Sequence, residues 1–442
     1  MRAAESPPIA GGNMLERYFG LAEHGTTVRR EILAGFTTFL TMAYIIIVNP
    51  SILSTTGMDA GGVFVATCLA AAFGTLVMGL YANYPIALAP GMGLNAFFAF
   101  GVVGAMGYSW QVALGAVFLS GVIFVIVSLL PIREWIINSI PRSLKMAISA
   151  GIGLFLGIIA LENAGVVVDH PVTLVTLGNV ASTTVLLAAA GFVVMVALDA
   201  LAVPGAIIIG ILLTTAVGIL VGVSEFQGIA DLPPDPSPVL LQLDIVGAFE
   251  VGLITIIFTF LLVDFFDTAG TLVGVAHRAG LLDEQGRLPR IGRALLADST
   301  ATVFGAAVGT STTTSYIESA AGIKAGGRTG LTALTVGLLF LAALFLSPLA
   351  LSVPAYATAP ALLFVACLMA RGLAELDWED VTEYAPGVVT ALAMPLTYSI
   401  AHGIGIGFIV YALVKILAGR FSQLHPVVVL VAALFVVKFA FL

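Results

Sequence analysis

Charged side chains are scarce in this chain. Asp, Glu, Lys and Arg together make up 10% of its 442 residues, whereas hydrophobic residues make up 60%. A water-soluble domain of this size needs a far larger charged fraction to cover its surface, so the composition excludes one. The net charge is -8 and no basic run is longer than Arg29-Arg30, which argues against a nucleic-acid partner.

Cysteines are almost absent, and so are the motifs of cofactor binding. Cys68 and Cys367 stand alone in apolar runs and form no disulfide or metal pattern. The five histidines lack metal-ligand spacing, and without a Walker A motif ATP is not the energy source within this chain. Gly91-Met-Gly-Leu-Asn-Ala96 has the letters of a dinucleotide-binding loop, but its surroundings lack the strand, helix and acidic residue that such a site requires. We therefore expect neither a metal nor a cofactor.

Long apolar runs are abundant. They fill the chain from about Phe36 to its end, and the polar first 13 residues lack the basic-then-apolar order of a cleavable signal. The sequence therefore predicts an all-α protein that crosses the lipid bilayer many times. A further apolar run, 426–442, carries Lys438 and is either another span or an interfacial helix. Fourteen spans are expected at residues 30–53, 62–82, 92–105, 111–130, 143–163, 181–201, 204–223, 247–275, 291–308, 315–324, 329–347, 354–371, 383–400 and 402–419.

The distribution of positive charge predicts the orientation of these spans. When the fourteen spans are threaded, the arginines and lysines of the loops fall on one face. The loops 164–180 and 224–246 of the other face carry Asp and Glu but no Lys or Arg. Because basic loops stay on the cytoplasmic side, we expect a multi-pass protein of the cytoplasmic membrane with a cytoplasmic N-terminus.

Two of the expected spans are too short to cross the bilayer. The third begins with the proline-bounded stretch 84–90, which cannot be helical, and the tenth begins with the Thr/Ser run 309–315. Because they lie seven spans apart, they predict an inverted repeat whose broken segments meet at the midplane, where a substrate binds. The expected division is a cytoplasmic segment 1–27, a first seven-span repeat 28–225, an extracytoplasmic loop 226–246, a second seven-span repeat 247–420 and a C-terminal apolar segment 421–442.

Two carboxylates in the eighth span are the strongest functional signal. Asp264 and Asp267 are spaced i, i+3 in a helix long enough to cross the bilayer, and Thr268 and Thr271 extend their face. A carboxylate at the bilayer centre costs about 2.5 to 3.5 kcal/mol, so both should face protein or a water-filled cavity. The pair therefore predicts a functional site.

Five further residues are candidates for the same site. Glu318 lies in the half-helix of span ten, and Asn95 in that of span three can offer both a donor and an acceptor. Phe266 and Tyr316 flank the polar positions and either stack on a planar ligand or pack against lipid and helices. Asp298 either pairs with threonines or a cationic loop edge, or takes part in transport.

Four stretches in combination resemble a known family. They are Met42-Ala-Tyr-Ile-Ile-Ile-Val-Asn-Pro50, Ala89-Pro-Gly-Met-Gly-Leu-Asn95, Asp264-Phe-Phe-Asp-Thr-Ala-Gly-Thr271 and Gly309-Thr-Ser-Thr-Thr-Thr-Ser-Tyr-Ile-Glu318. From about Arg17 to the C-terminus the chain resembles the AzgA-like purine permeases, a branch related to the nucleobase–ascorbate transporters. The resemblance implies a proton-coupled importer of adenine, guanine or hypoxanthine with an elevator-like cycle. It also implies a core of spans 1–4 and 8–11, a gate of spans 5–7 and 12–14, and room for a homodimer through the gate.

The resemblance and the residue arguments together give a set of expected roles. Related carriers have one substrate-binding carboxylate in span eight with a Gly three residues on, so Gly270 makes Asp267 the closer counterpart. Asp264 is then a proton site or a structural partner. The expected substrate-binding residues are Asp267, Glu318, Asn95, Gly93, Thr271, Phe266 and Tyr316, and the expected proton-coupling residues are Asp264, Asp267 and Glu318.

Two other functions fit part of the pattern. An anion or other small-solute transporter of the same fold would use the N-termini of both half-helices, but three acids near the centre would repel an anion. An intramembrane aspartyl protease needs two aspartates on separate helices, whereas Asp264 and Asp267 share one. Gradient-driven transport of a neutral purine therefore fits the residues best.

Overall fold

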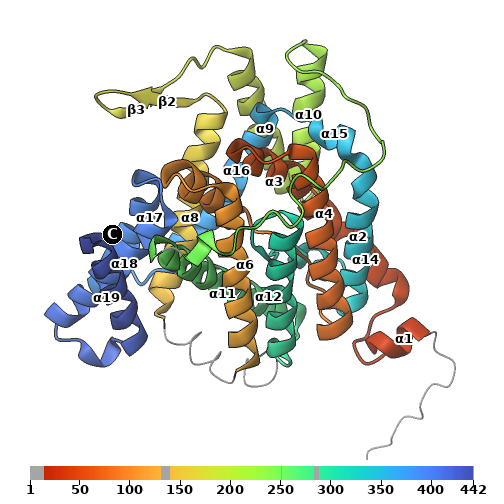
Figure 1. The fold of residues 1–442 in the computed structure, drawn as a ribbon. Coiled ribbons are helices and arrows are strands. Elements are labelled where there is room, and N and C mark those ends of the chain that lie inside the picture. The colour runs from red at the N-terminus through yellow and green to blue at the C-terminus, as the bar shows by residue number, and fades with distance from the viewer. Residues whose placement is uncertain (1–13, 131–139, 250, 283–287, 442) are drawn as a thin grey trace, which may run out of the picture.

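The computed structural model describes residues 14–130, 140–249, 251–282 and 288–441, which are mostly helical (Figure 1). Among these residues, nine helices are long and apolar enough to cross a membrane, and three shorter apolar helices accompany them. Each of the fourteen expected spans coincides with a helix or with a helix interrupted by a strand or a turn. The prediction of a polytopic all-α membrane protein is therefore confirmed.

Half of the helices form a core. Within it, α6 packs against α12, and α14 packs against α2 and α4. These are spans one to four and eight to eleven, as the resemblance implied. The core elements are α2 (Val28–Met42), α3 (Ile45–Leu53), α4 (Ala60–Val77), β1 (Leu88–Pro90), α5 (Met92–Ala96), α6 (Trp110–Leu129), α11 (Val251–Ala279), α12 (Ile291–Val308), β4 (Thr313–Ser315), α13 (Ser319–Lys324) and α14 (Gly330–Ala343).

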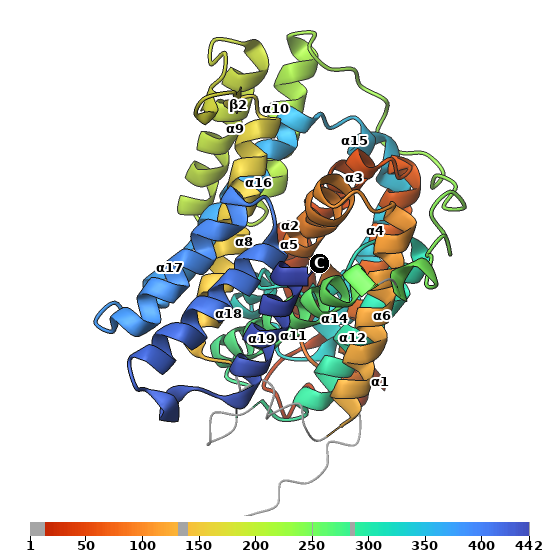
Figure 2. The ribbon, with the colours of Figure 1, turned by 60° about the vertical axis from the view of Figure 1, so that its left-hand side comes forward.

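The remaining long helices form a gate beside the core. Here α8 packs against α16 and α17, α17 packs against α18, and α9 packs against α10. Figure 2 separates the gate helices on the left from α4, α6, α12 and α14 of the core on the right. The gate helices are α8 (Arg142–Asn163), α9 (Thr183–Ala200), α10 (Ala206–Leu220), α16 (Ala355–Ala370), α17 (Val381–Leu396) and α18 (Ile400–Leu417).

The two short spans meet as predicted. Strands β1 and β4 pair antiparallel, with Ala89 opposite Thr314. The pairing extends beyond the strands, because the Gly91 N–H donates to Thr312 O (2.9 Å) and the Tyr316 N–H donates to Ala87 O (2.9 Å). Proline in one strand and threonine in the other disfavour helix at this point, so each chain runs extended before its half-helix begins. The antiparallel pairing gives the two half-spans the opposite directions that an inverted repeat requires.

Polar residues at helix starts fix where several spans begin. The Asp59 carboxylate accepts from the Gly62 N–H (2.7 Å) at the start of α4. Ser109, Ser182 and Ser399 similarly cap α6, α9 and α18. Each side chain satisfies a backbone donor that the helix leaves without a partner, which matters most where little water is present.

Several elements outside the core and gate complete the fold. The hairpin of β2 (Val167–His170) and β3 (Leu174–Leu177) occupies the loop 164–180 and was not expected from the sequence. The C-terminal helix α19 (Pro426–Phe441) lies along α18, and Phe439 near its end contacts His402 at the start of α18, so the two helices are antiparallel. The short elements are α1 (Met14–Phe19), α15 (Ser347–Leu351), the π-helical turns Met78–Ala82 and Phe97–Ala105, and the 3-10 turns Ser54–Thr56, Gly247–Phe249, Leu344–Leu346, Arg371–Glu375 and Phe421–Gln423.

Candidate functional site

Glu318 lies at the centre of the candidate site. It follows β4 and directly precedes α13, where the extended backbone turns into a half-helix. The Tyr44 hydroxyl donates to Glu318 Oε1 at 2.6 Å, and the Thr41 hydroxyl reaches Glu318 O at 3.4 Å. Tyr44 is fully buried at the joint between α2 and α3. Residues of span one therefore hold both the side chain and the backbone of Glu318.

A cavity of about 250 Å³ is lined in part by Glu318. The core contributes Thr41, Ile317, Glu318 and Ala321 to its wall, and the gate helices provide the rest. Because residues of the core and of the gate both line this space, a small ligand in it would touch both parts of the molecule. The gate residues of the wall are Asp199, Val203, Gly205, Ala206, Ile207, Phe364, Leu368 and Arg371.

Asp267 belongs to the same region. Its residue is exposed although it lies in the middle of α11, and its carboxylate is close enough to Glu318 to interact with it electrostatically. Tyr316 is buried within reach of both charges, and its hydroxyl donates to Pro90 O at 2.6 Å. The structure therefore brings together three of the residues that the sequence singled out, Asp267, Glu318 and Tyr316.

Asp264 faces a different environment from Asp267. It is buried, and the Thr302 hydroxyl of α12 donates to its Oδ2 at 3.1 Å. The prediction that the two aspartates share one polar face is therefore only partly right. Residues four apart on a helix overlap better than residues three apart, so Asp264 lies with Thr268 on the side of α12, while Asp267 lies with the half-buried Thr271.

Asp298 completes a buried network behind the cavity. The Thr268 hydroxyl donates to Asp298 Oδ2 (2.8 Å), and the Ser315 hydroxyl donates to Asp298 Oδ1 (2.8 Å). Thr268 also lies 2.8 Å from the hydroxyl of Thr314. Of the two readings of Asp298, pairing with hydroxyl side chains is the one that the structure contains. The network joins α11, α12 and β4.

Asn95 and Gly93 lie in the half-helix of span three. Asn95 is fully buried, and neither atom of its side-chain amide has a hydrogen-bond partner among the described residues. Gly93 faces the gate, since a Cβ at this position would lie 2.4 Å from Cγ2 of Ile152 in α8. Glycine is therefore required here for close approach of core and gate. Phe266 lies in α11, but its side chain is outside the described part of the structure.

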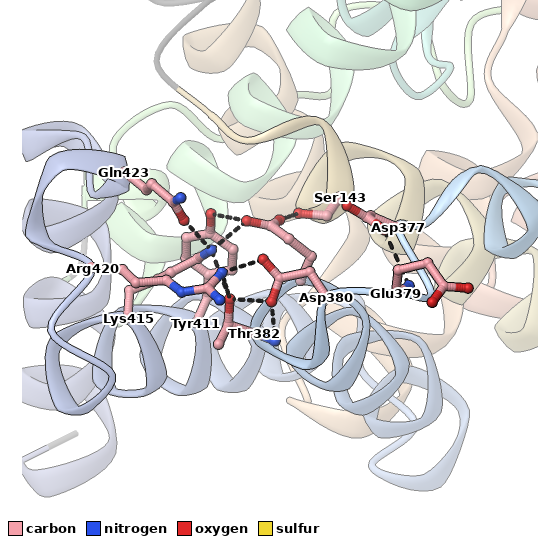
Figure 3. Close-up of polar contacts among 10 residues, drawn as sticks. Ser143, Asp377, Glu379, Asp380, Thr382, Tyr411, Lys415, Arg420 and Gln423 are labelled. Carbon is pink, nitrogen blue, oxygen red and sulfur yellow. Dashed lines mark hydrogen bonds and ion pairs between the residues drawn. The ribbon is translucent and has the colours of Figure 1, made fainter.

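A second polar cluster occupies one end of the gate (Figure 3). Lys415 of α18 is buried and forms an ion pair with Glu383 of α17. Arg420 pairs with Asp380, whose pKa is lowered to about 2 by hydrogen bonds from the hydroxyl and the backbone N–H of Thr382. A cleft of about 770 Å³ lies beside this cluster, and it shares no residue with the cavity at Glu318.

Sequence reasoning missed Tyr44 and the hydroxyl partners of the buried acids. Tyr44 lies in the stretch 42–50 that carried part of the resemblance, so a signal was present, but nothing in one sequence links it to Glu318, 274 positions away. Thr302 and Ser315 were likewise hidden among many small polar residues. In the part of the chain that the structure describes, no three His, Cys, Asp or Glu side chains gather as metal ligands would.

Comparison with solved structures identifies the fold. The transmembrane domain of a cyanobacterium bicarbonate transporter, BicA, aligns with a TM-score of 0.64 at 14% identity and covers 85% of this chain and 97% of that chain. The murine Slc26a9 anion transporter in the inward-facing state also gives 0.64, at 12% identity, over 95% of this chain and 74% of that chain. At these identities the likeness shows a shared architecture alone.

Sequence comparison goes further. Adenine permease AdeP of Escherichia coli (strain K12) is 51% identical over 98% of this chain and 97% of its own length. Guanine/hypoxanthine permease PbuG of Bacillus subtilis (strain 168) is 48% identical over 97% of this chain and 100% of its own length. The model described as "Permease family" matches residues 29–406. The chain therefore belongs to the permease family, and its relatives agree with the purine-permease branch, related to the nucleobase–ascorbate transporters, that its four motifs indicated.

Proposed function

We propose that this chain imports purine nucleobases across the cytoplasmic membrane together with protons. Adenine and guanine/hypoxanthine permeases that are about half identical over nearly the full length support a purine substrate. A purine is planar, neutral and edged with N–H donors, and carboxylates bind such donors by charge-assisted hydrogen bonds. Asp267 and Glu318 supply two carboxylates close enough to interact electrostatically, and in this proposal both bind the purine.

One observation carries the proposal. Glu318, a core residue, lines a cavity whose wall is formed mainly by residues of the gate. A ligand bound there would move with the core and change its exposure as the core shifts against the gate, which is the elevator-like cycle we propose. The predicted topology has a cytoplasmic N-terminus and places the ends of α9 and α16, with Asp199 and Arg371, on the cytoplasmic side. On that topology the cavity opens inward.

Within this proposal the acids have separate duties. Asp267 and Glu318 bind the purine, and at least one of them also carries the proton. Asp264 is buried beside Thr302 and is either a further proton site or a structural partner. Asn95, Gly93, Thr271, Phe266 and Tyr316 are the further residues that we propose for the substrate site. The described residues Asn95, Gly93, Thr271 and Tyr316 lie outside the wall of the cavity at Glu318.

Uptake of radiolabelled adenine, guanine and hypoxanthine into proteoliposomes tests the function. Glu318→Gln and Asp267→Asn should each lower apparent affinity by one to two decades, because each removes a charge-assisted bond of about 1.5 to 3 kcal/mol. Glu375→Gln is the matched control, since Glu375 is exposed and pairs with Arg142 on the gate surface. Uptake like that of the wild type in Glu318→Gln would remove Glu318 from the site.

The driving ion is tested in the same vesicles. A protonophore should abolish accumulation of purine, whereas replacing sodium by potassium should not. Accumulation that survives the protonophore and disappears without sodium would overturn proton coupling. Labelled bicarbonate serves as the rival substrate, because the fold is shared with a bicarbonate transporter; the acids of this site should exclude it. A homodimer through the gate is a separate proposal, tested by cross-linking in the membrane.

A further inference from the structure

Tyr44 and Glu318 come from opposite halves of the chain and meet beside the core–gate cavity. We propose that Tyr44 is a positioning residue for transport: its hydroxyl holds Oε1 of Glu318 and thereby sets the pH at which this carboxylate exchanges its proton with the cavity. This inference rests on the proton-coupled function proposed above and adds to it a residue that touches neither the cavity nor the purine.

The geometry supports a role for Tyr44 in orienting the carboxylate of Glu318. Its side chain is fully buried, and its hydroxyl donates to Glu318 Oε1 at 2.6 Å, the short distance typical of a bond to an ionised carboxylate. The nearby phenol of Tyr316 cannot replace it, because that hydroxyl donates to Pro90 O. Thr41, one turn before Tyr44, holds the backbone oxygen of Glu318. The carboxylate therefore has a fixed orientation before any ligand arrives.

The position of Tyr44 relative to the cavity explains how its hydrogen bond to Glu318 would affect transport. Tyr44 is absent from the cavity wall, whereas Thr41 and Glu318 are part of it. Tyr44 holds Oε1 without lining the cavity through which a proton or a purine N–H would reach Glu318. Tyr44 thus affects the proton without competing for the ligand.

Other titratable and charged groups around Glu318 divide into two sets. Tyr44, Tyr316 and Asp267 belong to the core and travel with Glu318. Asp199 and Arg371 belong to the gate and face Glu318 only across the cavity. When the core shifts, the gate charges are left behind while the bond from Tyr44 persists. The tyrosine therefore provides the constant part of the proton affinity, and the gate provides the part that changes during the cycle.

The pH dependence of uptake tests the proposal. A hydroxyl that donates to a carboxylate favours the ionised form, so without it the protonated form persists to higher pH. Initial uptake falls as external pH rises, because the carboxylate loses its proton; we call this part of the curve of uptake against pH the falling limb. Tyr44→Phe should move the midpoint of this limb to higher pH by about one unit. A role in packing alone would lower the maximal rate and leave the limb in place.

Two comparisons sharpen the experiment. Tyr356→Phe is the matched control, because Tyr356 is a buried tyrosine of the gate whose hydroxyl lies 2.5 Å from Ser224 Oγ; its limb should not move. Incorporation of 3-fluorotyrosine at position 44 keeps the shape of the side chain and makes the phenol a stronger donor, so the limb should move to lower pH. This substitution remains informative if Tyr44→Phe fails to fold.

The outcomes separate this inference from the function on which it rests. An unmoved limb in Tyr44→Phe, or in the fluorotyrosine protein if the first variant is unstable, overturns the role of Tyr44 and leaves proton coupling intact. Proton-driven uptake that persists unchanged in Glu318→Gln overturns the coupling role of Glu318 itself, and the inference falls with it. Opposite shifts in the two tyrosine variants, with none in Tyr356→Phe, support it.

Discussion

Replacing Lys415 with methionine should destabilise the gate far more than removing an ion pair from its surface. Lys415 has no exposed side-chain area, and its Nζ lies 2.5 Å from Glu383 Oε1, 2.8 Å from the Thr382 hydroxyl and 2.7 Å from Gln423 Oε1 (Figure 3). All three of its N–H donors are therefore used. The cluster ties α17, α18 and the turn Phe421–Gln423 together.

The size of the effect follows from what the substitution leaves behind. Breaking a buried ion pair costs about 3 to 5 kcal/mol, because the remaining charge loses its partner. Glu383 is 20% exposed and keeps hydrogen bonds from Tyr411 and Ser143, so we expect the lower end, about 3 kcal/mol. The double variant Lys415→Met/Glu383→Gln should recover part of this loss, since it leaves no uncompensated charge.

Unfolding of the purified protein in mixed micelles measures these differences. The control is Arg142→Ala, which removes the partner of Glu375 in a pair whose side chains are 77% and 51% exposed. Such a pair contributes about 0 to 1 kcal/mol. If Lys415→Met costs no more than Arg142→Ala, burial of the lysine does not strengthen the pair and the reasoning is wrong. Purine uptake at low temperature should survive, because the cluster shares no residue with the cavity at Glu318.

Two further predictions concern acid stability and selectivity. The pKa of Asp380 is lowered from 3.8 to about 2, so the folded state should lose stability as pH falls from about 4 to 2, and Asp380→Asn should flatten that part of an unfolding curve measured against pH. Asn95→Ala should weaken binding by about 1 to 3 kcal/mol and change the ranking of adenine, guanine and hypoxanthine in competition assays without moving the pH profile. Equal losses for all three purines with a shifted profile would instead assign Asn95 to the proton path.

Much of the fold could be predicted because bilayer physics constrains the sequence strongly. A spanning helix must be apolar, and loops rich in Lys and Arg must alternate with loops that lack them. The fourteen spans could therefore be recognised individually from the sequence. The two broken spans could be recognised too, because proline and a Thr/Ser run disfavour helix locally, whatever the surrounding residues are. The hairpin β2–β3 was not, since its valines and leucines lie in a loop that has no bilayer to constrain it.

The site was predicted at the level of residue type but not of partnership. Acids at membrane depth are costly, so Asp264, Asp267 and Glu318 were visible without a structure. Which of them face a cavity depends on a rotation of about one helical position, and that rotation is set by the packing of α11 on its neighbours, chiefly α6. Tyr44 illustrates the same limit, because an aromatic residue in an apolar span has no distinguishing feature until its hydroxyl is seen to reach Glu318.

The connection from α10 back to the core runs beside the connection that contains α15. The Gln227 N–H donates to Ser352 Oγ (2.8 Å), and the Asp231 N–H donates to Phe345 O (3.0 Å). The short helix α15 itself joins α14 of the core to α16 of the gate. Its five residues rise about 1.5 Å each when helical and about 3.4 Å when extended, so unwinding them would release about 10 Å of chain. If the core slides along the gate as proposed, unwinding of α15 would supply the extra length of chain, and the connection hydrogen-bonded beside it would move with it.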